Sequence, residues 1–554
     1  TITDFSISRI KPGVMWTVSS NGQIYNTIDH GKVWTNVTNI ADLPPHTNFN
    51  TIEAGDDVNT AYVAARIGGG RGETVPPDED ADVPLIWRTT DGGKTWTSIV
   101  NGLPKDERTG SWVNTLRVDP GQPGLLFAGT ETTVCVSFDN GDHWQSLRQN
   151  LPSTSVRDLD VHTDHHQNDL VIGTYGRGFW VLDDITPLRQ IAASAQSIAS
   201  STVYLFEPED AIRARINSNW DQPFSIEVPH APNVPYGAIV DYYLSHEPTG
   251  PIQLQVFDAQ GNLIRTMSST LPPPIEGALF PHYWLASPES RALSTHTGLN
   301  RVNWNLYYDD PPALRHDLEN EMNMVEGSTT PGPHGPQVIP GDYTLKLTVD
   351  GQVYSRKVTV VNDPRVGQSP ELMAALRSQI KLTLLSVQGM EQSDQAHAEV
   401  EAVKDQLSTL MHGDLPADVA AQAKTLDAGL RKIGGVVPTP GSFGPGRPAP
   451  PDPNALKSFV ELNDAYNVMV SMMQVGLDMP PTPTQIATWE SDCNNYNRTV
   501  AAWKDMQPKI TDFNAALAKN QLHELTLAPT KLTDASCSFT SEGSRKVSKQ
   551  RTPR

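Results

Sequence analysis

TIDHGKVW at residues 27–34 recurs as TTDGGKTW at residues 89–96 and as SFDNGDHW at residues 137–144. All three segments follow the pattern Ser/Thr-x-Asp-x-Gly-x-x-Trp. In such a turn the aspartate accepts hydrogen bonds from nearby backbone N–H groups, the glycine takes a positive φ, and the tryptophan buries its ring against a neighbouring sheet. Copies roughly 50 residues apart predict four-stranded blades of a β-propeller. The structural residues of the three turns are Asp29, Gly31, Trp34, Asp91, Gly93, Trp96, Asp139, Gly141 and Trp144.

Short alternating segments lie upstream of each turn and indicate the inner strands of the blades. They occupy residues 3–7, 50–54, 114–118 and 157–161, which predicts four blades within residues 1–190. Propeller rings contain four to eight blades, and blades this long usually need six or more. We therefore expect the ring to be completed by upstream sequence or by another chain. The strand-like opening at residues 2–7 also suggests that the chain starts inside a longer protein.

The three turns resemble the Asp-box (BNR) repeats of sialidases and of sortilin-type propellers. Residues 125–147 and 173–189 are similar to a family of large secreted bacterial proteins, usually labelled glycosyl hydrolase, BNR repeat or sortilin-like. The likeness continues to about residue 365. Family members carry two propellers before their C-terminal domains. The resemblance implies that this chain corresponds to the C-terminal half, and that it is extracellular or periplasmic.

Composition excludes several classes of protein. The 554 residues include 42 Lys+Arg and 63 Asp+Glu, a formal net charge of −21, which argues against a nucleic-acid-binding protein. Hydrophobic residues make up 38% and charged residues 19%, so the chain is neither a disordered acidic polymer nor a membrane bundle. No apolar run reaches the length of a membrane span. The 40 glycines and 45 prolines favour many turns and short strands.

The rest of the chain predicts further domains. Residues 191–222 are expected to be a connector, and residues 223–365 an immunoglobulin- or fibronectin-like β-sandwich with a hairpin at Asp350-Gly351. Apolar residues at helical spacing predict a bundle over residues 366–522, interrupted by a Pro/Gly-rich linker at 434–453. Residues 523–554 are expected to be a flexible tail.

The three cysteines leave two interpretations open. Cys493 and Cys537 could form one disulfide, or they could be free buried thiols, as Cys135 could also be. Their number is too small for a disulfide scaffold, and their spacing does not match a zinc site.

Three carboxylates are the first candidates for catalysis. Glycoside hydrolysis normally requires two carboxyl groups on either side of the scissile bond. In a propeller they would lie where the inner strands converge, and Glu53, Asp158 and Asp160 alternate on those strands. The alternative is that these residues form ion pairs between blades.

Metal and cofactor signals are weak. Asp78, Asp80 and Asp82 place oxygens at alternate positions, as calcium loops do, but a solvated acidic loop is the simpler interpretation. The segment 162–166, HTDHH, contains histidines that could bind a transition metal, although it also fits a polar loop. No cofactor is expected.

Three hypotheses of function follow. The first is an exported, non-catalytic binding or scaffold protein whose propeller face holds a polysaccharide or a polypeptide and whose helices mediate assembly, including homo-oligomers. The second is a glycoside hydrolase with its site at the propeller mouth. The third is a surface-layer or filament subunit, which predicts large exposed apolar patches. Carboxylates paired to arginines favour the first, and two carboxyls in reach of each other, one with a raised pKa, favour the second.

Overall fold

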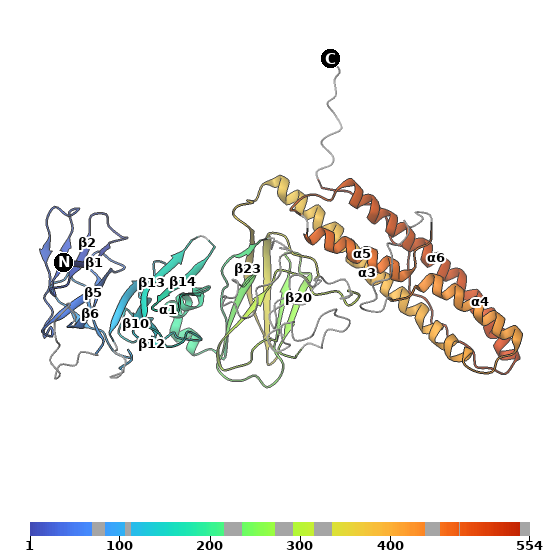
Figure 1. The fold of residues 1–554 in the computed structure, drawn as a ribbon, viewed down its shortest axis with the longest axis horizontal. Helices are drawn as coiled ribbons and strands as arrows, with labels where there is room; N and C mark the ends of the chain where they lie inside the picture. Colours follow the sequence, from blue (N-terminus) through green and yellow to red (C-terminus); the bar gives the residue numbers. More distant parts are fainter. Residues whose placement is uncertain are drawn as a thin grey trace, which may run out of the picture.

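The computed structural model describes residues 1–68, 83–105, 112–164, 166–214, 235–271, 292–314, 335–437, 455–475 and 477–542. The molecule is elongated. Figure 1 shows a row of sheets at the N-terminal end, a pair of sheets around β20 and β23 in the middle, and long helices at the other end. The chain is therefore mainly β in its first two thirds and α in its last third.

The N-terminal part consists of antiparallel sheets that follow one another along the chain. Sheet 1 is β1–β4, sheet 2 is β5–β8, sheet 3 is β9–β12 and sheet 4 is the three-stranded β13–β15. The strand bounds are Ile2–Ile7, Met15–Ser19, Ile24–Thr27 and Thr35–Asn36 for β1–β4; Thr47–Ala54, Ala61–Ile67, Leu85–Thr89 and Thr97–Ser98 for β5–β8; Val113–Val118, Leu126–Thr130, Val134–Ser137 and Gln145–Ser146 for β9–β12; and Val156–Thr163, Asn168–Thr174 and Phe179–Leu182 for β13–β15.

Successive sheets pack face to face because their strands are apolar on both faces. In sheet 2, Val63 and Trp87 belong to the core shared with sheet 1, whereas Tyr62, Ala64 and Ile86 belong to the core shared with sheet 3. Alternate residues of a strand point to opposite faces, so one strand can serve two cores. The first strands β1, β5, β9 and β13 are neighbours in that order, which brings their polar side chains together.

Two further sheets share a single core in the middle of the molecule. Their orders are β16-β18-β21 and β17-β23-β22-β19-β20, and the core includes Tyr242, Trp304 and Leu345. The Asp350-Gly351 turn has positive φ at both residues and joins β22 to β23, which confirms the predicted hairpin. The elements are α1 Thr186–Ala199, β16 Val203–Leu205, β17 Ala211–Arg213, β18 Ala238–Leu244, β19 Gln253–Phe257, β20 Leu263–Ser268, β21 Gly298–Trp304, β22 Gly341–Val349 and β23 Gln352–Asn362.

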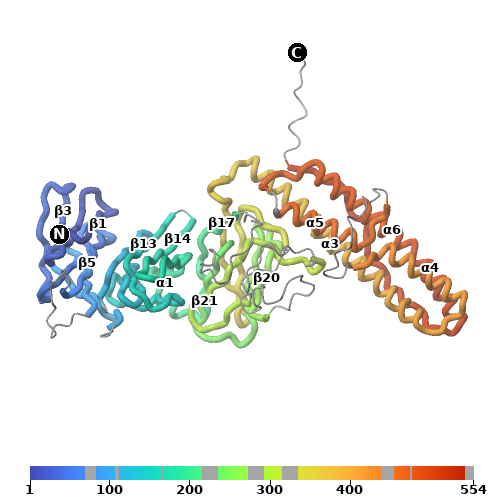
Figure 2. The backbone as a smooth tube through the Cα atoms, viewed as in Figure 1, coloured from blue at the N-terminus to red at the C-terminus, as the bar shows by residue number. Residues whose placement is uncertain are grey.

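Long helices form the C-terminal part, and their course is clear in the tube of Figure 2. Ser369 caps the first one through the backbone N–H of Leu372, as the Ser-Pro-Glu sequence predicts. Tyr466, Tyr496 and Trp503 lie in the shared core, so these three aromatic side chains pack the bundle. The bounds are α3 Pro370–Met411, α4 Ala417–Gly434, α5 Phe459–Val475 and α6 Pro483–Lys519.

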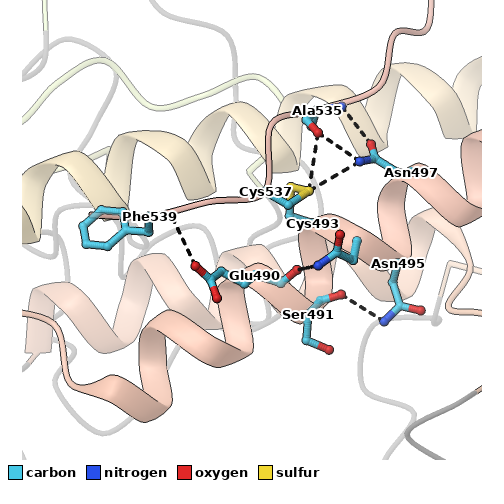
Figure 3. The surroundings of a disulfide bond; sticks show 9 residues. Glu490, Ser491, Cys493, Asn495, Asn497, Ala535, Cys537 and Phe539 are labelled. Carbon is cyan, nitrogen blue, oxygen red and sulfur yellow. Dashed lines mark hydrogen bonds between the residues drawn. A yellow bond between two sulfur atoms is a disulfide. The ribbon is translucent and has the colours of Figure 1, made fainter. Parts of the chain in front are cut away.

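A disulfide holds the segment after α6 against the bundle. Cys493 and Cys537 are bonded, with their Cα atoms 5.4 Å apart. Figure 3 shows the reciprocal hydrogen bonds beside it, in which Asn497 binds the backbone N–H and carbonyl of Ala535. Leu525 and Leu532 are buried in the helical core. The expectation of a flexible tail from residue 523 is therefore wrong up to residue 542, because these apolar side chains and the disulfide fix the segment.

One other expectation also needs correction. Residues 186–199 form α1, although the preceding strand pattern suggested only a connector beginning at residue 191. Residues 370–411 form a single helix, α3, whose buried residues continue along its whole length. The linker at 434–453 lies mostly outside the described residues, as does the tail from residue 543.

In the described part of the chain, no helix combines the length and the apolar character needed to cross a membrane.

Candidate functional site

The three aspartate turns share one hydrogen-bond geometry. In the first, the Thr27 hydroxyl donates to Asp29 at 2.9 Å and accepts from the backbone N–H of Gly31 at 3.1 Å. Asp29 in turn accepts from the backbone N–H groups of Lys32 and Val33, each at 3.0 Å. These contacts stabilise the carboxylate, and the N–H of Val33 contributes most to holding the pKa of Asp29 below its usual value.

The second and third turns repeat this arrangement. Hydrogen bonds from Thr95, first through its backbone N–H, lower the pKa of Asp91 to about 2. Burial acts to raise the pKa of Asp139, but the contacts with His143 outweigh it and lower the value. All three carboxylates are engaged by their own turn, which suits a structural role.

The tryptophans of the turns differ in their surroundings. Trp96 and Trp144 are 9% and 3% exposed, and each donates its indole N–H to a backbone carbonyl of the preceding sheet, at Val37 and Ile99 respectively. Trp34 is 41% exposed. The expectation that all three rings are buried is therefore wrong for Trp34, because no earlier sheet in the described residues packs on sheet 1.

Polar residues of the first strands meet along the edge that these strands form in sheets 1–4. Arg9 follows β1 and reaches Glu53 at 3.4 Å and the carbonyl of Val118 at 3.2 Å. Burial raises the pKa of Glu53, and the nearby Arg117 and Arg9 oppose that shift. Glu53 thus shows one feature of each alternative. Its raised pKa is expected of a catalytic carboxyl group, and its pairing with Arg9 is expected of a structural ion pair.

The second candidate carboxylate shares an arginine with the first. Arg117 donates to Asp158 at 2.7 Å, and its charge also acts on Glu53. Asp158 further accepts from the Thr115 hydroxyl at 3.3 Å and from the backbone N–H of Leu159 at 2.9 Å. Asp160 lies two residues after Asp158 on β13, and its side chain is exposed. The structure therefore gathers Arg9, Glu53, Arg117 and Asp158 into one polar cluster, called here the inner-strand cluster.

The described residues offer little for a metal ion. Asp78, Asp80 and Asp82, the residues of the expected calcium loop, lie outside them. The imidazole of His166 lies 3.1 Å from Asp210, and that of His162 lies 3.7 Å from Asp164. Among the residues that the structure places, no three His, Cys, Asp or Glu side chains are grouped as metal ligands.

A second polar cluster, which the sequence did not reveal, joins sheet 4 to the middle sheets. Arg301 binds the buried Asp241 at 2.9 Å and donates to the backbone carbonyls of Asp183 and Asp184. Asp184 is 1% exposed, and its Oδ2 atom has no hydrogen-bond partner. Burial, reinforced by Asp184, raises the pKa of Glu209 to about 8. We call Asp184, Glu209, Asp241 and Arg301 the junction cluster; the four residues are too far apart in sequence to be grouped by a motif.

Comparisons with known proteins give a partial match. No family model matches the chain. A stretch of 138 residues is 30% identical to a probable oligoxyloglucan-reducing end-specific xyloglucanase of Neosartorya fischeri. The match covers 24% of this chain and 14% of that enzyme's length. It supports a likeness to propeller proteins of the glycosyl hydrolase kind, and does not single out the Asp-box or sortilin-like families.

Solved structures of propeller proteins also show similarity. YCF48 bound to a D1 peptide is 21% identical, with a TM-score of 0.23, over 34% of this chain and 56% of that one. An ancestral GH74 enzyme is 12% identical, with a TM-score of 0.20, over 64% of this chain and 54% of that one.

Proposed function

We propose that residues 1–190 are blades of a β-propeller in an exported protein that binds a polypeptide or a polysaccharide without hydrolysing it. The middle sheets act as a spacer, and the helical part mediates assembly. The observation that carries this proposal is the pairing in the inner-strand cluster. Arg9 pairs with Glu53 and Arg117 pairs with Asp158, so both carboxyl groups are engaged within the protein, whereas a hydrolase needs them free to face its substrate.

The disulfide supports export. Disulfides persist in oxidising compartments and are rare in the cytosol. Cys493 is 2% exposed, and its bond to Cys537 fixes a segment that packs on the bundle. The bond is therefore a structural disulfide.

Binding at the inner-strand cluster is tested with the full chain against xyloglucan oligosaccharides and against unfolded polypeptides by calorimetry. Arg117→Ala removes the partner of Asp158 and should weaken binding at least ten-fold. Arg377→Ala is the control, because Arg377 pairs with Glu542 on the helical part, and it should bind normally. Equal binding by wild type, Arg117→Ala and Asp158→Asn would exclude this cluster as the ligand site.

The alternative is a glycoside hydrolase. It is favoured by the raised pKa of Glu53, which a general acid requires, and by the partial match to a xyloglucanase. Release of reducing ends from xyloglucan oligosaccharides would establish the activity. Its loss in Glu53→Gln, Asp158→Asn or Asp160→Asn, with unchanged melting temperatures, would identify the carboxyls. Absence of release by the wild-type chain supports the binding function.

A further inference from the structure

Sheets 1, 2 and 3 carry equivalent residues directly after their outer strands. Val37, Ile99 and Leu147 each donate their backbone N–H to the third strand of their own sheet, at Ile24, Ile86 and Val134. Because the three residues make the same hydrogen bond, they occupy equivalent positions in their sheets, whatever their sequence similarity.

Val37 and Ile99 make the same contact with the next sheet. Their carbonyls accept the indole N–H of Trp96 and Trp144, at 2.9 and 2.8 Å. Their side chains pack on the glycine of the following turn so closely that a Cβ at Gly93 or Gly141 would lie 2.6 or 2.5 Å from them. One β-branched residue therefore makes two contacts with the next turn. Its side chain packs on the glycine, and its carbonyl accepts the indole N–H of the tryptophan.

The turn of sheet 1 has the same shape but different surroundings. The three atoms nearest to a Cβ at Gly31 would belong to its own sheet, to Met15 and Trp34, at 3.5 Å or more. Pairing across the strands places Phe5 where sheets 2 and 3 have Ile52 and Leu116. Phe5 is 62% exposed, whereas Ile52 and Leu116 are 1% and 3% exposed.

The neighbouring position shows the same contrast. Ile7 corresponds to Ala54 and Val118, and it is 54% exposed against 9% and 2%. Ile28 and Val33, in the turn itself, are 69% and 63% exposed. Exposed apolar residues gathered on one face mark an interaction surface. Phe5 and Ile7 occupy the positions that pack on the preceding sheet in sheets 2 and 3. Ile28 and Val33 add apolar surface beside them, although their counterparts Thr90, Thr95 and His143 are exposed.

We propose that this face of sheet 1, formed by Phe5, Ile7 and the turn of Trp34, binds a further four-stranded sheet of the same repeat. That sheet carries valine or isoleucine directly after its outer strand. The carbonyl of this residue accepts the indole N–H of Trp34, and its side chain packs on Gly31. The proposal rests on the blade architecture proposed above and is independent of the ligand.

A second copy of this chain does not fit the surface. Val37 and Ile99 are already engaged by the next sheets, and Leu147 packs on the core that sheet 3 shares with sheet 4. Sheet 4 has three strands, and the chain then passes through the fully buried Ile185 into α1. The partner is therefore a blade other than those described in residues 1–182.

The test adds such a blade to the full chain. A copy of sheet 2, ending in Ile99 and followed by its own connection to sheet 3, is fused ahead of Ile2. Labelling of a Phe5→Cys thiol reports the surface, since Cys135 is buried and Cys493 and Cys537 are bonded. We expect the fusion to slow labelling at least ten-fold, and to shift the fluorescence assigned to Trp34, by difference from Trp34→Phe, to shorter wavelength.

Two controls make the result specific. Phe179→Cys, on the 85% exposed position of sheet 4, should label at the same rate with and without the fusion. Ile99→Asp in the fused copy alone should restore rapid labelling of Phe5→Cys. A copy of sheet 1, ending in Val37, serves as the donor if the copy of sheet 2 does not fold.

The proposal is overturned if Phe5→Cys labels rapidly beside a folded copy of either sheet. It is also overturned if the unfused chain protects Phe5→Cys by dimerising in sedimentation experiments, because the occupant would then be a second copy. Loss of ligand binding in the Arg117→Ala variant leaves the labelling result unchanged, so the two proposals fail independently.

Discussion

At the residue scale, the sequence predicts contacts between neighbouring residues better than contacts between separate sheets. The hydrogen bonds of Asp29, Asp91 and Asp139 follow from a few neighbouring residues, so the motif is enough to predict them. The burial of the tryptophan depends on a different sheet, and here identical motifs give Trp144 at 3% and Trp34 at 41% exposure. The motif predicts the turn, and the neighbour decides whether the ring is covered.

Substituting the two tryptophans should therefore have unequal effects. Trp144→Ala removes a buried ring and leaves the carbonyl of Ile99 without its donor, and should cost about 3–5 kcal/mol. Trp34→Ala removes a ring that is 41% exposed and has no carbonyl partner among the described residues to leave unpaired, and should cost about 1–2 kcal/mol. The melting temperature of the N-terminal sheets, followed by calorimetry, measures both. Equal losses would contradict the difference in packing.

At the scale of the element, the periodicity of apolar residues predicted most helices and strands. It failed where a strand is followed almost directly by a helix. The capped start of α3 and the hairpin of β22 and β23 were predicted from Ser369-Pro370 and Asp350-Gly351. α1 was not, since it follows β15 after only three residues. The course of residues 523–542 could not be read from sequence, because it is fixed by contacts with helices far along the chain.

The disulfide should control the order of that segment. Cys537→Ser opens a loop whose ends are 44 residues apart, and the chain-entropy model assigns roughly 4 kcal/mol to such a closure. We expect backbone amides from Leu525 to Phe539 to exchange faster with solvent, while β22 and β23 stay protected. Cys135→Ser is the control for the loss of a thiol. Unchanged exchange in Cys537→Ser would show that Leu525 and Leu532 hold the segment without the bond.

At the scale of the whole molecule, the junction cluster connects the N-terminal sheets to the middle sheets. Arg301 on β21 binds Asp241 on β18 and the carbonyls of Asp183 and Asp184, which lie between β15 and α1. One guanidinium thus joins three segments of the chain, and its partners reach from Asp241, 60 residues away in sequence, to Asp183, 118 residues away. Such a cluster could not be predicted from sequence, since nothing in the spacing of its members distinguishes them from other acidic residues.

The junction should make stability depend on pH. Burial, with Asp184 adding to it, raises the pKa of Glu209 to about 8, so the folded protein binds this proton more tightly than the unfolded chain does. Burial also raises the pKa values of Asp184 and Asp241, which acts in the same direction. The stabilisation is complete below the unfolded pKa of about 4.5 and is lost as pH rises toward 8. Stability of the wild-type chain should therefore fall across this range.

Glu209→Gln tests the assignment, because glutamine keeps the shape and can still accept the hydrogen bond of Asn168 without ionising. The variant should be more stable at pH 8, by on the order of 2 kcal/mol, with allowance for the partial exposure of the side chain. Its urea midpoints between pH 5 and pH 8.5 should form a flatter curve than those of the wild type. Glu207→Gln, at an exposed neighbouring position, should follow the wild-type curve. Parallel curves for Glu209→Gln and wild type would show that the proton is held elsewhere in the junction, at Asp184 or Asp241.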